Sequence, residues 1–150
     1  MNYFFDTSAL VKHFYDEKGS EIVSGIILKK TNNIWISELA LIEIFSALYK
    51  KYRMKEIDES NLEIAIEGIK LEMEYFYVEP LNSLIIKEGI DLLEKYGRYY
   101  SLRTLDSLQI STFILLAEEK DWFFVASDEV LCKIVEEIGY PVLNPEKITL

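Results

Sequence analysis

Four acidic residues differ from the many acids that decorate predicted helix faces, and two of them follow predicted strands. Asp6 comes directly after the short run Asn2–Phe5, and Asp128 follows the apolar run Trp122–Ala126 after one residue. In an open parallel sheet, ligands bind outside the carboxyl ends of the strands, so both acids face one crevice. Taken alone, Asp128 is explained at least as well as a helix N-cap, and Asp6 also fits a turn or cap.

The other two acids lie within apolar helical patterns. Glu43 is the only charge in the segment Leu39–Leu48. If the apolar stripe packs on the sheet, Glu43 lies at or beside that stripe, where an unpaired ionised carboxylate is costly. It must then be neutralised, paired with a base or bound to a cation; the alternative is an edge position that reaches water. Asp106 lies in the first turn of another apolar helix, where the macrodipole alone could explain an acid.

Brought into one cleft, four carboxylates would repel one another, and some would take up protons unless a metal were present. Oxygen ligands without His or Cys suit Mg²⁺ or Mn²⁺ rather than zinc. Such a site binds phosphate through the metal and generates hydroxide for in-line attack on a phosphodiester.

The composition of the chain excludes several other kinds of functional site. The chain has 150 residues, which favours one domain over 1–150, and its net charge of −10 makes a general basic duplex binder an unfavourable interpretation. With one Cys (Cys132) and one His (His13), the chain can form neither an internal disulfide nor a Cys/His zinc cluster. A serine triad would have to use His13 itself.

The elements that must position these acids alternate along the chain. Short apolar runs predict strands at 2–5, 33–36, 76–78, 122–126 and 140–143. Three- and four-residue periodicity predicts helices at 8–16, 20–30, 59–75 and 84–96, a helix capped by Ser37, one capped by Thr104, and one opened by Ser127 and Asp128 and ended by Gly139. This alternation predicts an α/β fold with a parallel sheet covered on both faces.

No targeting or membrane segment is expected. The stretch Tyr3–Phe5 is stopped at once by Asp6 and has no charged leader, so it does not resemble a signal peptide. No run approaches the ~18 apolar residues of a membrane helix. We therefore expect a soluble protein of the cytoplasm.

Four segments in order resemble the motifs of PIN-domain ribonucleases, especially the VapC toxins of bacterial and archaeal toxin–antitoxin pairs. The opening string Phe5–Lys12 resembles the first motif, which carries Asp6. The segment Ile36–Leu48 is similar to the second motif, with Glu43 at a metal-binding position. The segment Leu102–Ile110 is similar to the third motif and carries Asp106. The segment Val125–Leu131 is similar to the fourth motif, with Asp128 and its hydroxyl neighbour Ser127, and Gly139–Pro145 is similar to the family's last strand.

The resemblance covers nearly the whole chain, and its implications are specific. It implies a PIN fold with about five short parallel strands, cleavage of single-stranded RNA that depends on Mg²⁺ or Mn²⁺, a homodimer, and a cognate antitoxin whose peptide covers the cleft. On this hypothesis the four acids hold one or two ions, directly or through water, while Ser8 and Ser127 orient carboxylates by hydrogen bonds. Gln109 stands where many relatives carry His, and we expect it to affect local packing rather than the metal.

Two stretches that interleave bases with tyrosines are candidate contacts for single-stranded RNA, 49–53 and 95–103. From these stretches and from the first motif we take Tyr52, Arg53, Arg103 and Lys12 as possible substrate contacts. The alternative for the tyrosines is a dimer or antitoxin interface, or a cover for the core at helix ends. Because the net charge is −10, we expect low general affinity for RNA.

Two other functions remain open at this stage. One is a PIN nuclease that processes RNA or acts on structured DNA without being a toxin. The other is a non-catalytic α/β protein-binding module whose acids are only caps and surface charges. A receiver-like phosphoacceptor domain is disfavoured, because the sequence has no acidic pair next to a strand and no evident lysine partner after a late strand.

Overall fold

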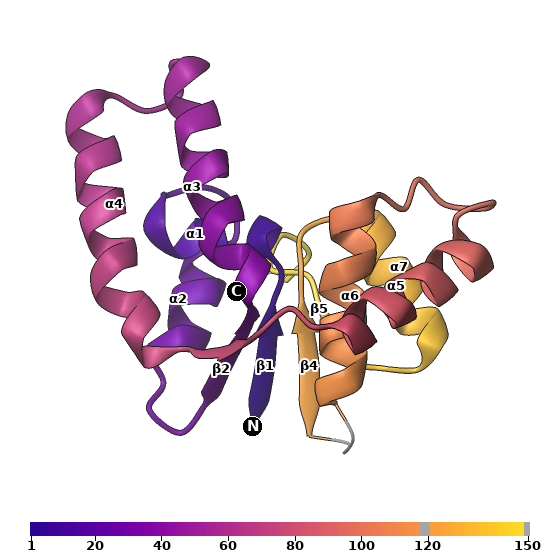
Figure 1. Cartoon of the computed structure of the whole chain (residues 1–150). Coiled ribbons are helices and arrows are strands. Elements are labelled where there is room, and N and C mark those ends of the chain that lie inside the picture. Colours follow the sequence, from indigo (N-terminus) through magenta and orange to yellow (C-terminus); the bar gives the residue numbers. More distant parts are fainter. Residues whose placement is uncertain (118–120, 149–150) are drawn as a thin grey trace.

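A central parallel sheet organises the computed structural model, which describes residues 1–117 and 121–148. Its five strands lie in the order β3-β2-β1-β4-β5, and every neighbouring pair is parallel (Figure 1). The strands are β1 (Asn2–Phe5), β2 (Asn33–Ser37), β3 (Tyr77–Glu79), β4 (Trp122–Val125) and β5 (Val142–Leu143). The predicted α/β class with about five short parallel strands is therefore confirmed.

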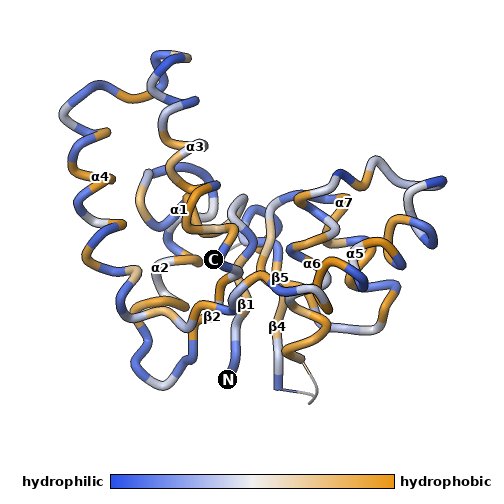
Figure 2. Tube along the Cα trace, in the orientation of Figure 1, coloured by the Kyte–Doolittle hydropathy of each residue, from blue (hydrophilic) through white to orange (hydrophobic). Residues whose placement is uncertain are grey.

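Helices connect the strands and cover both faces of the sheet, as Figure 1 shows. They are α1 (Thr7–Phe14), α2 (Ser20–Ile27), α3 (Glu38–Arg53), α4 (Glu59–Glu72), the short 3-10 helix η1 (Met73–Tyr75), α5 (Ser83–Tyr96), α6 (Thr104–Leu116) and α7 (Glu129–Ile138). Along the outer helix α4, hydrophilic and hydrophobic residues alternate in the manner of an amphipathic helix (Figure 2).

Two hydrophobic clusters, one on each face, hold the helices to the sheet. Successive strand residues point to opposite faces, so the adjacent Phe4 and Phe5, both fully buried, belong to different clusters. Phe5 packs with the core residues of α1 to α4, and Phe4 packs with those of α5 to α7. The ring of Phe113 on α6 lies 5.7 Å from that of Phe4.

Local signals explain where most elements begin and end. Ser37 caps α3, as predicted, by accepting a hydrogen bond from the backbone N–H of Leu39. Gly139 ends α7 with φ of 106°, a conformation that glycine adopts without strain. The cap of α6, however, is Arg103 and not Thr104, because the carboxylate of Asp106 accepts the backbone N–H of Arg103 and closes the first turn there.

Several predicted helices and strands are longer than those in the structure. Helix α1 ends at Phe14 and α2 at Ile27, and the run expected to form a helix up to Tyr75 tightens into η1 after Glu72. The last strand is confined to Val142–Leu143, since the preceding Pro141 has no N–H to donate to the sheet. Among the described helices, none combines the length and apolarity needed to cross a membrane.

Candidate metal centre

The ends of β1 and β4 bring Asp6 and Asp128 to the same edge of the sheet. The backbone N–H of Asp6 donates to the carbonyl of Val125 at 2.9 Å, so the pairing of the two strands runs up to the acid itself. Both acids also cap helices. Asp6 accepts from the N–H of Ser8 and opens α1, while Asp128 accepts from the N–H groups of Val130 and Leu131 and opens α7. The cap interpretation is correct for both residues, and it also fixes their carboxylates at the carboxyl edge.

Glu43 reaches the same edge from the second turn of α3, which starts directly after β2. Its Oε1 accepts a hydrogen bond from Nε2 of Gln109 at 2.6 Å and one from Oγ1 of Thr7 at 3.4 Å. The side chain is half-buried, and its partners belong to α6 and to the first residue of α1. Glu43 is therefore turned toward the end of β1 rather than out to solvent.

Asp106 enters from the first turn of α6 and pairs with Arg103. Nε of Arg103 lies 2.8 Å from Oδ2 of Asp106, and its Nη2 lies 3.1 Å from Oδ1, which makes a two-pronged ion pair. The Arg103 side chain is 75% exposed. The hydrogen bond to Asp106 raises the pKa of Arg103, with smaller contributions from Asp128 and Asp6. The guanidinium is thus attracted to three of the four acids while remaining open to solvent.

Two of the four carboxylates, those of Asp6 and Glu43, have raised pKa values. Burial is the main cause that raises the pKa of Asp6, and repulsion from Asp106 and Asp128 adds to it. Burial also raises the pKa of Glu43, and repulsion from Asp6 and Asp106 adds to it. Hydrogen bonds from Ser8 and from Gln109 act in the opposite direction on the two acids. Four acids from distant stretches of the chain therefore share one electrostatic environment.

The chemistry of this donor set fits a hard divalent cation. Within residues 1–117 and 121–148, no group of three or more Asp, Glu, His or Cys side chains is arranged so that it could hold a metal ion. Binding would therefore require the carboxylates to turn toward a common point. All the donors are oxygens, and a cation would relieve the repulsion that opposes ionisation of Asp6 and Glu43. The residues that would hold the ion are Asp6, Glu43, Asp106 and Asp128.

The two serines expected to orient carboxylates differ from each other. Ser8 donates its backbone N–H to Oδ2 of Asp6 at 2.9 Å, and its hydroxyl oxygen accepts the N–H groups of Ser127 and Asp128. The Ser127 hydroxyl is buried and has no hydrogen-bond partner among the described residues, so the hydrogen bond expected from it to a carboxylate is not formed.

Gln109 contacts one of the four acids, which the sequence did not predict. We expected it to affect packing, yet its amide donates directly to the Glu43 carboxylate across two helices. The spacing could have revealed it, because Gln109 lies three residues after Asp106 and therefore on the same side of α6.

Lys12 does not have the surroundings of a phosphate contact. Its side chain is only 4% exposed, and its ammonium pairs with Glu17 at 3.1 Å and with Glu146 at 2.7 Å. Two carboxylates already neutralise this buried charge, so Lys12 would have to leave both ion pairs to contact substrate.

Tyr52 and Arg53 are exposed, but they lie at the far end of α3. At 1.5 Å per residue, Arg53 is about 15 Å along the helix axis from Glu43. Together with residues 55–58 they line a shallow pocket of about 500 Å³. This separation favours a contact of Tyr52 and Arg53 with a more distant nucleotide over a contact with the phosphate at the acids.

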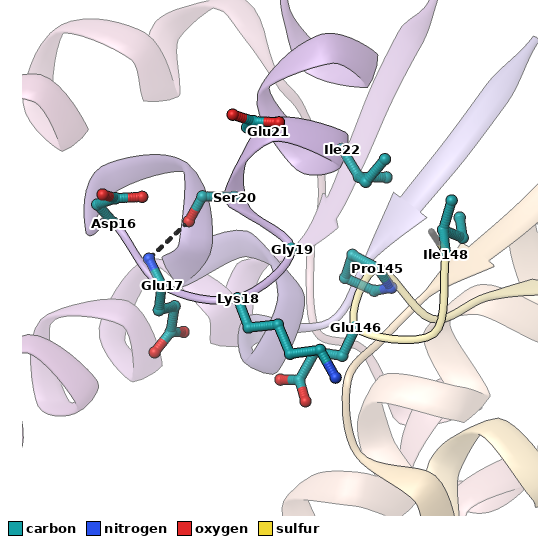
Figure 3. A pocket seen from close by; sticks show the side chains of 10 residues that line it. All are labelled: Asp16, Glu17, Lys18, Gly19, Ser20, Glu21, Ile22, Pro145, Glu146 and Ile148. Carbon is teal, nitrogen blue, oxygen red and sulfur yellow. Dashed lines mark hydrogen bonds between the residues drawn. The ribbon is translucent and has the colours of Figure 1, made fainter. Parts of the chain in front are cut away.

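A separate pocket of about 450 Å³ lies between the α1–α2 loop and the C-terminal segment (Figure 3). None of the four acids lines it. Gly19, with φ of 91°, packs so closely on Pro145 that an added Cβ would lie 3.0 Å from it. The backbone N–H of Glu17 in this loop donates to the hydroxyl of Ser20, the first residue of α2. These contacts fasten the C-terminal segment to the loop and explain the pocket without a ligand.

The fold and site define an α/β protein that gathers carboxylates at the carboxyl edge of a parallel sheet. The sequence model of the PIN domain matches residues 3–136, and the chain belongs to the PIN domain family, whose members are nucleases. No curated protein matched the sequence at a significant level.

Solved structures share the fold at low sequence identity. The structure of FitAcB from Neisseria gonorrhoeae has a TM-score of 0.71 and 10% identity, over 97% of this chain and 99% of that chain. VapBC2 from Rickettsia felis, bound to a DNA fragment from its promoter, gives 0.67 and 15%, over 96% and 98%. VapC20 from Mycobacterium tuberculosis, described as a Sarcin-Ricin loop cleaving toxin, gives 0.66 and 14%, over 92% and 95%.

Proposed function

We propose that this protein is an endoribonuclease that cleaves single-stranded RNA with one or two Mg²⁺ or Mn²⁺ ions held by Asp6, Glu43, Asp106 and Asp128. The observation that carries the proposal is the shared electrostatic environment of these acids, in which Asp6 and Glu43 are both harder to ionise than usual. Membership of the PIN domain family supports the nuclease chemistry.

The residues at this site have different roles in the proposed reaction. Asp6 and Asp128 are held in place by the backbone N–H groups that they cap. A bound ion would lower the pKa of a water molecule and position the phosphate for attack. Arg103, exposed and drawn toward the acids, is the cation best placed to contact the RNA phosphate beside them.

We further propose that the protein is the toxin of a toxin–antitoxin pair and that it forms a homodimer. Structural neighbours include VapC20, a toxin–antitoxin complex from Klebsiella pneumoniae and VapBC-1 from nontypeable Haemophilus influenzae, and these support the assignment. Large hydrophobic side chains remain exposed on α3 and α5, among them Ile42, Tyr49, Ile86 and Ile90. Such surfaces suit a second copy or an antitoxin peptide.

The Asp6→Asn variant tests the nuclease directly. Asparagine caps a helix as well as aspartate does, so the variant should fold while lacking one metal-binding charge. We expect the wild type to cleave single-stranded RNA with Mg²⁺ or Mn²⁺ and to stop when EDTA removes the ion, and we expect Asp6→Asn to be inactive. Glu63→Gln, which neutralises an exposed acid on α4, is the matched control and should cleave normally. Normal cleavage by Asp6→Asn would exclude the proposed role of this acid.

The toxin assignment needs a test in cells. Expression of the wild type alone should arrest growth, and co-expression of a small protein encoded beside it should restore growth. Expression of Asp6→Asn should be harmless. If the wild type cleaves RNA in vitro but does not affect growth, the chain is a PIN nuclease of RNA processing rather than a toxin.

A further inference from the structure

Helix α6 buries five polar side chains, and most of them form hydrogen bonds within the helix or at its cap. The hydroxyls of Ser107, Ser111 and Thr112 donate to backbone carbonyls three or four residues earlier. Asp106 pairs with Arg103 at the helix cap. Gln109 alone among these buried α6 polar side chains bonds to a residue of another helix, Glu43, which is 66 residues away in the sequence.

The contact between Gln109 and Glu43 has a fixed geometry. Gln109 is 1% exposed, so its amide is held by the surrounding core. Its Nε2 lies 2.6 Å from Oε1 of Glu43, and Thr7 donates to the same oxygen at 3.4 Å. Both donors therefore engage Oε1, while no described residue donates to Oε2.

Packing alone does not explain an amide at this position. The carbonyl oxygen Oε1 of Gln109 is buried without a hydrogen-bond partner among the described residues. Such an unpartnered buried acceptor destabilises the fold. A leucine would fill a similar volume without that cost, so what the amide contributes is its hydrogen bond to Glu43.

We propose that Gln109 is a positioning residue for the metal centre, which holds Oε1 of Glu43 so that Oε2 is presented to the cation. The inference rests on the proposed function, because it requires a divalent ion at the four acids. Groups that orient a metal ligand by hydrogen bonding typically change metal affinity 10–100-fold when removed. Gln109 would act entirely through Glu43 and would touch neither the ion nor the RNA.

Calorimetric titration of Mn²⁺ into the purified full chain at pH 8 tests this role, with thermal melts to check folding. Gln109→Leu removes the donor at nearly constant volume, and we expect Mn²⁺ to bind about tenfold more weakly. Gln109→Asn keeps the amide but shortens its reach, so it should lose affinity as well, and it replaces the leucine variant if that one fails to fold. Gln109→His supplies a ring N–H at a similar reach and should recover most of the lost affinity.

Ser111→Ala is the matched control, because Ser111 is equally buried on α6 but bonds only to its own helix. It should lower thermal stability and leave the affinity for Mn²⁺ unchanged. Wild-type affinity in a folded Gln109→Leu or Gln109→Asn protein would overturn the inference, and so would an equal loss of affinity in Ser111→Ala. A His variant that binds no better than the Leu variant would also overturn it. If the wild type itself binds no Mn²⁺, the proposed metal centre is wrong. If the wild type binds Mn²⁺ and a Gln109 variant binds it equally well, only the inference about Gln109 is wrong.

Discussion

The hydroxyl oxygen of Ser8 accepts a hydrogen bond from the backbone N–H of Ser127 at 3.0 Å, although the two residues are 119 positions apart in the sequence. Ser8 lies just after β1 and Ser127 just after β4, so this bond joins the two loops that carry Asp6 and Asp128. The placement of these two acids is thus supported by a contact between the Ser8 side chain and the backbone after β4.

Ser8→Ala should loosen this connection. The substitution removes the acceptor for the N–H groups of Ser127 and Asp128, and an unpaired buried donor costs about 1–3 kcal/mol. We expect a loss of this size in the free energy of unfolding, measured by urea denaturation, and weaker binding of Mn²⁺. Ser46→Ala, at an exposed site on α3, is the control and should change neither quantity by much. If the two variants are equally stable, the Ser8 bond does not hold the loops.

Asp6→Asn should stabilise the metal-free protein, and the gain should depend on pH. Because the pKa of Asp6 is raised in the folded state, the native protein holds its proton more tightly than the unfolded chain, whose pKa is 3.8. Stability therefore falls as the pH rises from 3.8 through the raised pKa, and the ionised acid is destabilising above it. We expect the variant to melt at a higher temperature than the wild type at pH 8, and at the same temperature below pH 3.8.

Asp58→Asn provides the comparison for this pH series. Asp58 caps α4 through the N–H of Asn61, but at an exposed position away from the four acids. Its substitution should give no gain in melting temperature at pH 8. A gain equal to that of Asp6→Asn would attribute the effect to capping instead of to the burial of the charge and its repulsion by the other acids.

Glu43→Gln should reduce the stabilisation that a divalent ion provides. An ion that binds only the folded state at one hundred times its Kd adds about 2.7 kcal/mol of stability. Glutamine keeps the shape of the side chain but lowers the negative charge at the site. We expect Mn²⁺ to raise the melting temperature of the wild type more than that of the variant, and EDTA to abolish the difference. Equal shifts in the two proteins would place the ion elsewhere.

The sequence predicts those parts of the site that depend on local pattern. Asp6 and Asp128 are evident because each follows an apolar strand, and Glu43 is evident as a lone charge in an apolar helix. The partners of these acids are not evident, because they meet only in the folded chain. The spacing from Asp106 places Gln109 on the site-facing side of its helix, but the sequence pattern does not show that its partner is Glu43 on another helix.

The same reason explains why the sequence does not reveal the partners of Lys12. Its place beside the first motif suggested a role at the phosphate, but its partners Glu17 and Glu146 come from the following loop and from the C-terminal segment. Similarly, Thr104 has the residue type of a cap, while the Arg103–Asp106 pair moves the start of α6 by one residue. Residue type predicts caps well only when no stronger local hydrogen bond competes.

Lys12→Met should therefore affect stability and not RNA binding. Burial raises the pKa of Glu17, but hydrogen bonds from Lys51 and Lys12 outweigh burial and hold that pKa below its ordinary value of 4.5. The ion pair accordingly stabilises the fold above that value, and its contribution disappears as the pH falls through the lowered pKa. We expect the variant to be less stable than the wild type at pH 7, with the difference shrinking in acid, and its KM for RNA to be unchanged. Lys18→Met, at an exposed site in the same loop, should alter neither. A raised KM with unchanged stability would instead mean that Lys12 binds the substrate. Lys12 would then have to leave its two carboxylates, because a buried ammonium cannot pair with them and with a phosphate at the same time.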